Sequence, residues 1–349
     1  IIIKFRIMKN KEIKLETNQV NYQETMSISK RIQLFIVRNF SWFLAIGVFI
    51  LLGIVRTTFL RINTISYMLY ISSLTGFLIF GQAICLISGN FDLSIARIAG
   101  ISVLTGALIM TRWAPNTPPF LAVIFVVIFG AVLGFINGIL VGKIGVNSFL
   151  ATLSTYLIYL YLAYYLLSAP IGGDKLTKTY LWLGSAEIGG INISFIIFVL
   201  LGLFLHFILR RTSFGIKIYA TGADPEVSKA LGIDTGNVVL FSYTIAGALG
   251  GIAGLAYAGF TGSVTNSIAM GEVFWTFAGA IIGGISLRGG RGSMINVIGG
   301  AIFIGLVTTG VLVFDIVATL RMVIAGGIIL ISILISRARE LWEEKLLKL

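Results

Sequence analysis

Few residues of this 349-residue chain could take part in catalysis or metal binding. It contains one histidine, His206, and one cysteine, Cys85. His206 has no second histidine and no acid close to it in the sequence, whereas a metal site needs several such ligands. A single cysteine cannot form a disulfide within the chain. We therefore expect neither a metal site nor a catalytic centre.

The segment Gly283–Ser293, with the sequence GGISLRGGRGS, combines glycines with arginines and is therefore compared with phosphate-binding loops. A Walker A loop has the form GxxxxGK[ST], in which the lysine and the hydroxyl are essential. Gly284 and Gly289 have this spacing, but a glycine and an arginine follow them. We expect no nucleotide site here. The alternatives are a tight turn with lipid-facing arginines, or contact with another cytoplasmic subunit through Arg288 and Arg291.

The composition indicates whether this chain folds in water or in a lipid bilayer. The chain is 57% hydrophobic and only 11% charged, with a mean hydropathy of +0.99. Soluble domains carry roughly 25% charged residues. The apolar residues fall in blocks of about 17–25, the length that crosses a bilayer core of about 30 Å. We therefore predict an all-α, multi-pass membrane protein in contact with the lipid bilayer.

Ten transmembrane helices are predicted, and the segment at 272–286 is short enough to be tilted or broken. An even number of spans places both termini on one side of the membrane. The net charge of +12 arises mainly from lysines and arginines on that side, which predicts cytoplasmic termini and no nucleic-acid partner. The predicted spans are 39–57, 64–88, 95–112, 119–141, 147–168, 192–209, 237–260, 272–286, 295–314 and 317–336.

The spans divide the chain into three parts. Residues 1–38 form a polar cytoplasmic segment without the features of a signal peptide. Residues 39–336 form the transmembrane domain, which includes a cytoplasmic connection at 210–236 and an outer connection at 169–191. Residues 337–349 form a cytoplasmic tail.

Glycines recur every four residues at Gly130, Gly134, Gly138 and Gly142. Such a stripe lets helix backbones approach closely in a membrane, which predicts tight helix packing. Lining of a transport path is the alternative.

Three acids border predicted spans: Asp92, Glu272 and Asp315. A carboxylate at the bilayer centre costs about 2.5–3.5 kcal/mol on insertion scales, so we expect each of them at a span end. Asp92 is predicted to cap the following helix, with a wet cavity or a partner contact as alternatives. Carriers driven by ion gradients usually need acids inside the membrane. We therefore expect the energy for any transport to come from another subunit.

The cytoplasmic connection contains the signals of a short helix. Asp224 can cap it, Pro225 suits its first position, and Glu226 places negative charge at its positive end. Gly232 then ends it. The pattern predicts a two-turn helix on the cytoplasmic face, although an ordinary capped loop would have the same signals.

This loop resembles the EAA-type coupling segment of permeases of binding-protein-dependent ABC importers, in the form found in their ribose/xylose branch. Three further stretches occur in that branch's order. Ser88–Ser94 (SGNFDLS) is similar to its GGIDLS motif, and Gly283–Ser293 is similar to its GGTSLxGGRGS motif. Gly142–Leu153 (GKIGVNSFLATL) is similar to its KxxxxPFIxTL segment. The resemblance extends over roughly residues 40–336.

The resemblance implies a permease that moves a monosaccharide, such as a ribose- or xylose-like sugar, by alternating access. It implies separate ABC ATPase subunits that bind ATP and magnesium, whereas this chain would bind no cofactor and would not be an enzyme. It also implies a second permease copy, in a homodimer or heterodimer, and an extracytoplasmic sugar-binding protein. The location would be the cytoplasmic membrane of a prokaryote.

The chain departs from the family pattern at Asn90, Phe91, Ala96, Asn147–Ser148 and Val273–Phe277. These departures leave the cargo open. A nucleoside, a furanosyl signalling molecule and, less favoured, a branched-chain amino acid are the alternatives. A self-sufficient channel or gradient-driven carrier is a remote alternative.

The candidate residues form three sets. Those expected to contact the ATPase through the coupling loop are Asp224, Pro225, Glu226, Val227, Lys229, Ala230, Leu231 and Gly232. Those expected along the substrate pathway are Gln82, Asn90, Asp92, Ser94, Asn147, Phe149 and Trp275. Arg288 and Arg291 are the candidates for a further cytoplasmic subunit contact.

Overall fold

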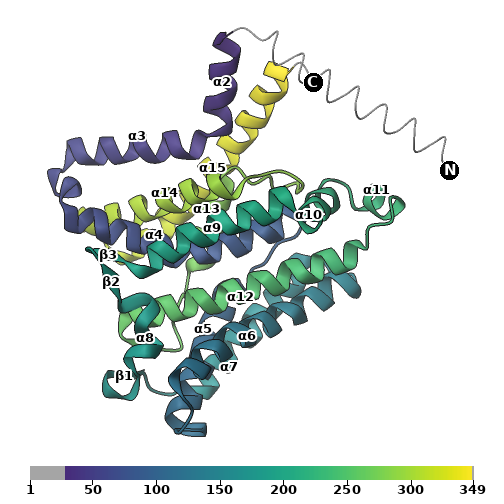
Figure 1. The fold of residues 1–349 in the computed structure, drawn as a ribbon. Coiled ribbons are helices and arrows are strands. Elements are labelled where there is room, and N and C mark those ends of the chain that lie inside the picture. The colour runs from purple at the N-terminus through teal and green to yellow at the C-terminus, as the bar shows by residue number, and fades with distance from the viewer. Residues whose placement is uncertain (1–27, 348–349) are drawn as a thin grey trace.

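The computed structural model describes residues 28–347, and this part of the chain is almost entirely helical (Figure 1). The strands β1–β4 have two residues each. The first eight helices are α2 (Ile28–Arg38), α3 (Phe40–Val55), α4 (Ile62–Ile87), α5 (Ile95–Leu108), α6 (Pro119–Gly138), α7 (Ser148–Leu166), α8 (Lys178–Ser185) and α9 (Ile193–Arg211). They are followed by α10 (Ser213–Ala223), α11 (Pro225–Ala230), α12 (Thr235–Thr261), α13 (Glu272–Ile282), α14 (Met294–Val313) and α15 (Ala318–Leu347).

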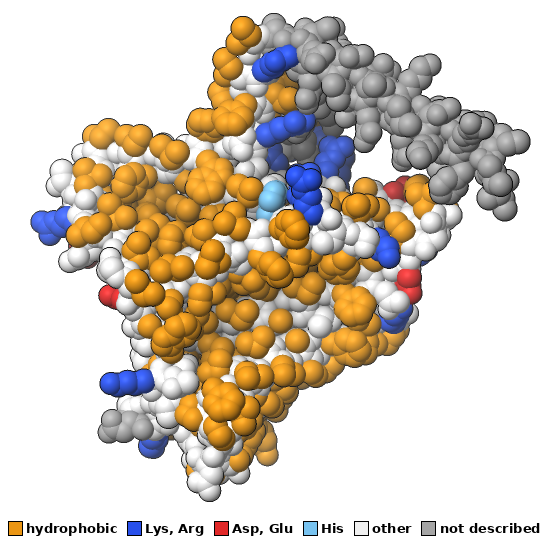
Figure 2. Space-filling view, viewed as in Figure 1, with side chains coloured by type: hydrophobic (Ala, Val, Ile, Leu, Met, Phe, Trp, Pro, Cys, Tyr) orange, Lys and Arg blue, Asp and Glu red, His pale blue; other side chains and the backbone are white. Residues whose placement is uncertain are grey.

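Each of the ten predicted spans coincides with one of these helices. Among the described residues, eight helices are long and apolar enough to cross a membrane, or nine if the bent pair of α2 and α3 is counted as one span. The axes of α2 and α3 differ in direction by 75°. The short segment predicted at 272–286 is α13, which has 11 residues. Hydrophobic side chains cover most of the face in Figure 2, as expected of a surface that meets lipid.

The centre of the bundle is α4, which is buried at every residue from Ile71 to Ile87, with α5 and α12 beside it. The glycine stripe of α6 packs directly on α12. A Cβ atom added to Gly130 would lie 2.5 Å from the carbonyl oxygen of Gly247, and one added to Gly142 would lie 2.5 Å from that of Gly236. The prediction of tight helix packing is therefore confirmed for this stripe.

Gly134 provides a test of this packing. A Cβ atom at this position would overlap the carbonyl oxygen of Tyr243 in α12, so α6 and α12 would have to separate. We expect Gly134→Ala to lower the free energy of unfolding by about 1–3 kcal/mol, the usual cost of overpacking. Gly47→Ala in α3 is the matched control, because nothing lies within 4 Å of a Cβ atom there. Thermal unfolding of both variants in detergent measures the difference, and equal midpoints would contradict the packing role.

The two long connections lie at opposite ends of the bundle (Figure 1). The connection after α7 contains β1 (Ile171–Gly172), α8, β2 (Glu187–Ile188) and β3 (Ile191–Asn192), and β1 pairs antiparallel with β4 (Ser263–Val264). The connection after α9 contains α10 and α11. It was predicted to contain one helix of two turns. It contains two helices, and α11 is shorter than predicted, with six residues, because the chain turns at Leu231.

The two described ends of the chain lie together. Leu34 and Val37 of α2 form a small apolar cluster with Leu346 of α15. The predicted boundary between transmembrane domain and tail, at residue 336, does not coincide with a helix end, because α15 continues to Leu347. Most of the predicted N-terminal segment, residues 1–27, lies outside the described residues.

Candidate functional site

The predicted coupling helix has the caps that its sequence indicates. The Oδ1 atom of Asp224 accepts hydrogen bonds from the backbone N–H groups of Glu226 and Val227, at 3.0 Å each. Pro225 occupies the first helical position. Gly232 follows the helix with φ +85°, a conformation that favours glycine. These contacts fix the start and the end of α11 without help from the rest of the bundle.

The side chains of α11 point largely away from the protein. Val227 and Leu231 are 54% and 61% exposed, whereas Ser228 is buried against the loop. Glu226 and Lys229 form an ion pair of 2.9 Å on the exposed surface. In Figure 1 the helix lies at the far end of the connection, beyond the ends of α9 and α12. Such an exposed surface can bind another protein.

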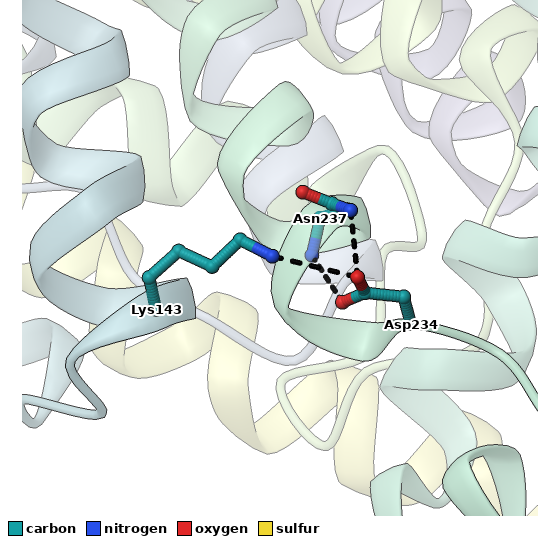
Figure 3. Close-up of polar contacts among 3 residues, drawn as sticks. All are labelled: Lys143, Asp234 and Asn237. Carbon is teal, nitrogen blue, oxygen red and sulfur yellow. Dashed lines mark hydrogen bonds and ion pairs between the residues drawn. The ribbon is translucent and has the colours of Figure 1, made fainter.

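A polar contact ties the base of this loop to the neighbouring helix (Figure 3). Lys143, at the end of the π-helical turn Ile139–Lys143 that continues α6, forms an ion pair of 3.4 Å with the Oδ2 atom of Asp234. Asn237 donates to both carboxylate oxygens, with its backbone N–H at 2.9 Å and its side-chain amide at 2.6 Å. The backbone hydrogen bond, followed by Lys143, lowers the pKa of Asp234. The sequence did not predict this contact, because Lys143 and Asp234 are far apart in the chain.

Asp92 and Ser94 come together in the connection between α4 and α5. The Oδ1 atom of Asp92 accepts from the backbone N–H of Ser94 at 2.8 Å and from its hydroxyl at 2.7 Å. Asn137 of α6, which the sequence did not single out, donates to the Ser94 hydroxyl at 2.7 Å. Asp92, Ser94 and Asn137 are fully buried. Asp92 therefore orders the turn just before α5. The N-cap residue of α5 is Ser94, which has no side-chain cap hydrogen bond, so Asp92 itself is not the N-cap that the capping interpretation predicted.

Burial raises the pKa of Asp92 to about 6, against the smaller opposing effect of its hydrogen bonds to Ser94. A folded-state pKa above the ordinary value of 3.8 means that the folded protein binds the proton more tightly than the unfolded chain. We expect the protein to lose stability as the pH rises from about 4 to about 6. At about 1.4 kcal/mol for each unit of pKa difference, the loss is on the order of 2–3 kcal/mol.

The variant Asp92→Asn keeps the acceptor for Ser94 and removes the titration. We expect its unfolding temperature to show little of this pH dependence. Thermal unfolding in detergent at several pH values between 4 and 8 measures the effect. The same pH dependence in both proteins would show that the Asp92 carboxyl is not its source.

The other pathway candidates are dispersed. Gln82 is fully buried in α4, and neither polar atom of its side chain has a partner among the described residues. Asn90 bonds locally to the carbonyl of Ser88 at 3.1 Å. Asn147 caps α7 by accepting from the N–H of Phe149 at 3.0 Å, and Phe149 is 50% exposed. Trp275 is buried in α13. The structure thus does not bring these candidates together around one cavity.

Glu272 is the first residue of α13, at a span end as expected, but it lies beside the middle of α4. Its Oε2 atom accepts a hydrogen bond of 2.9 Å from Thr75, which lies half-way along α4. The Thr75 hydroxyl is also 3.1 Å from that of Tyr257. The cause is the connection 262–271, which folds back into the bundle before α13 begins, with left-handed backbone at Ala269 and Gly271. A hydropathy pattern does not show such a return.

Arg97 lies in the first turn of α5 and is only 2% exposed. Its guanidinium donates to the carbonyl of Ile268 at 3.1 Å and lies 5.8 Å from the centre of the Tyr156 ring. Arg97 and Glu272 also interact electrostatically. Ionisable groups inside a membrane domain are costly, so a functional role is the first hypothesis for this pair.

The two arginines proposed for a subunit contact lie near each other on the connection between α13 and α14. Both are exposed, and Arg291 also lines a cavity whereas Arg288 does not. Among residues 28–347 no group of three or more His, Cys, Asp or Glu side chains is arranged to hold a metal ion.

Residues 64–333, from α4 to α15, match the protein family described as "Branched-chain amino acid transport system / permease component". The match covers more than half of the chain. The chain belongs to this family. The resemblance to ABC importer permeases, which rested on four motifs, is thereby confirmed. This permease is also all-α and polytopic, as predicted.

Several import permeases are similar to this permease over most of their length. It is 28% identical over 292 residues to the galactose/methyl galactoside import permease protein MglC of Escherichia coli (strain K12), which covers 79% of this chain and 87% of that protein. It is 28% identical over 299 residues to the ribose import permease protein RbsC of Bacillus subtilis (strain 168), with coverages of 84% and 92%. It is 27% identical over 294 residues to the autoinducer 2 import system permease protein LsrC of Salmonella typhi, with coverages of 76% and 82%. No solved structure matches the chain.

Proposed function

We propose that this protein is the permease subunit of an ABC importer and moves a monosaccharide into the cell by alternating access. The observation that carries the proposal is α11, a capped helix that presents Val227, Glu226 and Leu231 beyond the ends of the membrane helices. The contact between Lys143 and Asp234 joins its base to α6. Movement of α11 by a docked ATPase would thus reach the bundle as a rigid-body motion.

The partners follow from this assignment. Separate ATPase subunits bind ATP and magnesium and dock on α11, and this chain itself binds no cofactor. A second copy of the permease, or a close relative, completes the pathway, and an extracytoplasmic binding protein delivers the solute. The complex lies in the cytoplasmic membrane of a prokaryote, with residues 210–236 on the cytoplasmic side.

A monosaccharide is the favoured cargo because the similar permeases MglC and RbsC are named for galactose and ribose import. Within that class a ribose- or xylose-like sugar is our first choice, from the motifs in Ser88–Ser94 and Gly283–Ser293. Import of a nucleoside or a furanosyl signalling molecule is the second candidate, since LsrC is named for autoinducer 2.

The polar groups at mid-depth of the bundle are the best placed to meet a sugar. Glu272 and Arg97 lie where α13 begins, and Thr75 and Tyr257 add hydroxyls beside them. Thr75 and Arg97 are buried in this conformation, as are Gln82, Asp92, Ser94 and Trp275, so all of them would contact solute only after the bundle opens. The cluster of charged and hydroxyl groups can bind a polyhydroxylated solute without catalysing any reaction.

Reconstitution tests the proposal. Vesicles containing this permease, its ATPase subunit and its binding protein should take up a radiolabelled pentose or hexose only when ATP is enclosed. Uptake by the purified permease alone, driven by an ion gradient, would overturn the assignment. Competition with unlabelled galactose, ribose, xylose and a nucleoside identifies the cargo, and a system indifferent to every sugar would exclude the monosaccharide class.

A further inference from the structure

A cavity of about 550 Å³ opens at the same end of the bundle as α10 and α11. It lies between the ends of α2 and α9, the connection before α14, and α15. Four arginines from these four elements line it, together with Ser293 and Asn296 at the start of α14. The arginines are Arg38, Arg210, Arg291 and Arg339. No acidic residue of the described chain is among its lining residues.

The chemistry of this cavity is that of a phosphate site. Guanidinium groups bind phosphate oxygens in pairs through a planar set of donors. Arg210 makes a cation–π contact with the Tyr219 ring, at 5.7 Å, and interacts electrostatically with His206. Among the described residues, the Arg291 side chain donates no hydrogen bond. Arg339 is held in place by the carbonyl of Gly284, at 3.0 Å. The N-terminus of α14, a helix of 20 residues, adds its positive end, and the Ser293 side chain accepts no capping hydrogen bond there.

The surroundings of the cavity favour a lipid over a soluble anion. Arg38 is the last residue of α2. The axis of α2 makes an angle of 75° with the axis of α3, and its side chains Ile28, Ile32 and Phe35 are exposed. A helix with exposed apolar residues and several basic ones is typical of a membrane interface. Figure 2 shows basic side chains gathered where α2 stands away from the bundle, with hydrophobic side chains on α2 beside them. Basic pockets between membrane helices on the cytoplasmic side bind the headgroups of anionic lipids.

We propose that this cavity binds the phosphate of an anionic phospholipid from the cytoplasmic leaflet. The headgroup lies among the four arginines at the start of α14, and the acyl chains lie along the exposed apolar residues of α2 and α3. Arg210 and Arg291 supply the charge that selects an anionic over a zwitterionic lipid. The lipid thereby joins α2, α9 and α15 at the end where the ATPase is proposed to act. This inference does not depend on the cargo or on the ATPase.

Native mass spectrometry of the delipidated full-length permease tests the site, with dioleoyl-phosphatidylglycerol and dioleoyl-phosphatidylcholine as probes. We expect one phosphatidylglycerol to be retained at least tenfold more strongly than phosphatidylcholine. The variant Arg210→Gln with Arg291→Gln should lose this preference by about tenfold or more, because each arginine near an anionic lipid contributes roughly 1 kcal/mol. The variant Arg210→Lys with Arg291→Lys should keep most of it.

The matched control is Arg211→Gln with Arg288→Gln. It removes the same charge from the same helix end and the same connection, but neither residue lines the cavity. Equal losses in the control and the test variant would overturn the site, as would no loss in either. Should the double glutamine variant not purify, Arg291→Gln alone carries the test, because Arg291 is exposed.

A soluble probe separates the two sources of phosphate. Glycerol-1-phosphate at the lipid's concentration should not displace phosphatidylglycerol, because it lacks the acyl chains. Displacement at equal concentration would show a site for a free anion and would overturn the lipid assignment. Because the measurement contains no ATPase and no sugar, its failure would leave the proposed transport function untouched, and failed transport would leave this result untouched.

Discussion

Glu226→Lys is expected to abolish sugar uptake in vesicles that contain the complete importer, while the ATPase continues to hydrolyse ATP. Glu226 is the acid in the first turn of α11, and its side chain is 83% exposed, in the surface proposed to dock on the ATPase. The substitution reverses the charge of that surface, and a like charge facing a partner's cation costs several kcal/mol in association. Uptake per ATP hydrolysed measures the coupling.

The same substitution should leave the fold intact. The ion pair between Glu226 and Lys229 is exposed, and such pairs contribute roughly 0–1 kcal/mol. Glu187→Lys is the matched control, because it makes the same charge change on an exposed strand at the opposite end of the bundle. We expect normal coupling in Glu187→Lys. Normal coupling in Glu226→Lys would count against α11 as the point of contact.

Replacement of Glu272 by Leu is expected to reduce sugar uptake by one to two orders of magnitude. It removes the acceptor of the Thr75 hydrogen bond and leaves the buried Arg97 without its acidic neighbour. Losing a hydrogen bond to a charged group costs about 1.5–3 kcal/mol, which corresponds to this range. Initial rates of uptake at several sugar concentrations measure the effect, which should lie mainly in the apparent affinity if Glu272 contacts the sugar.

Two variants separate sugar binding from structure at this position. Glu272→Gln keeps the acceptor for Thr75 and should therefore fold like the natural protein while still losing uptake. Asp315→Asn is the matched control, because Asp315 is an exposed acid at the turn between α14 and α15. Full uptake with Glu272→Leu would exclude the polar cluster from the pathway.

Local signals in the sequence predicted the local structure well. Each of the ten apolar blocks coincides with a helix, because a helix satisfies its own backbone in lipid. Only eight described helices, or nine with the bent pair of α2 and α3, are long and apolar enough to cross a membrane. Asp224, Pro225 and Gly232 predicted the ends of α11, since capping depends only on neighbouring residues. The spacing of Gly130, Gly134 and Gly138 predicted a packing face, although the partner helix, α12, could not be named from one sequence.

Contacts between residues that are far apart in the sequence could not be predicted from these local signals. Nothing in the sequence joins Lys143 to Asp234, or Asn137 to Ser94, because each pair belongs to different helices. Hydropathy alone could not show that residues 262–271 return into the bundle and bring Glu272 within hydrogen-bond distance of Thr75 in α4. The arginine cavity is a similar case, since it is assembled from four elements that span most of the chain.

Chemical labelling of α11 tests the central claim most directly. In Val227→Cys the new thiol lies at a position that is 54% exposed, whereas the natural Cys85 is fully buried and should not react. A membrane-impermeant maleimide should label this variant in inside-out vesicles, and addition of the ATPase subunit should protect it. Labelling only in right-side-out vesicles, or labelling that the ATPase subunit leaves unchanged, would contradict the account.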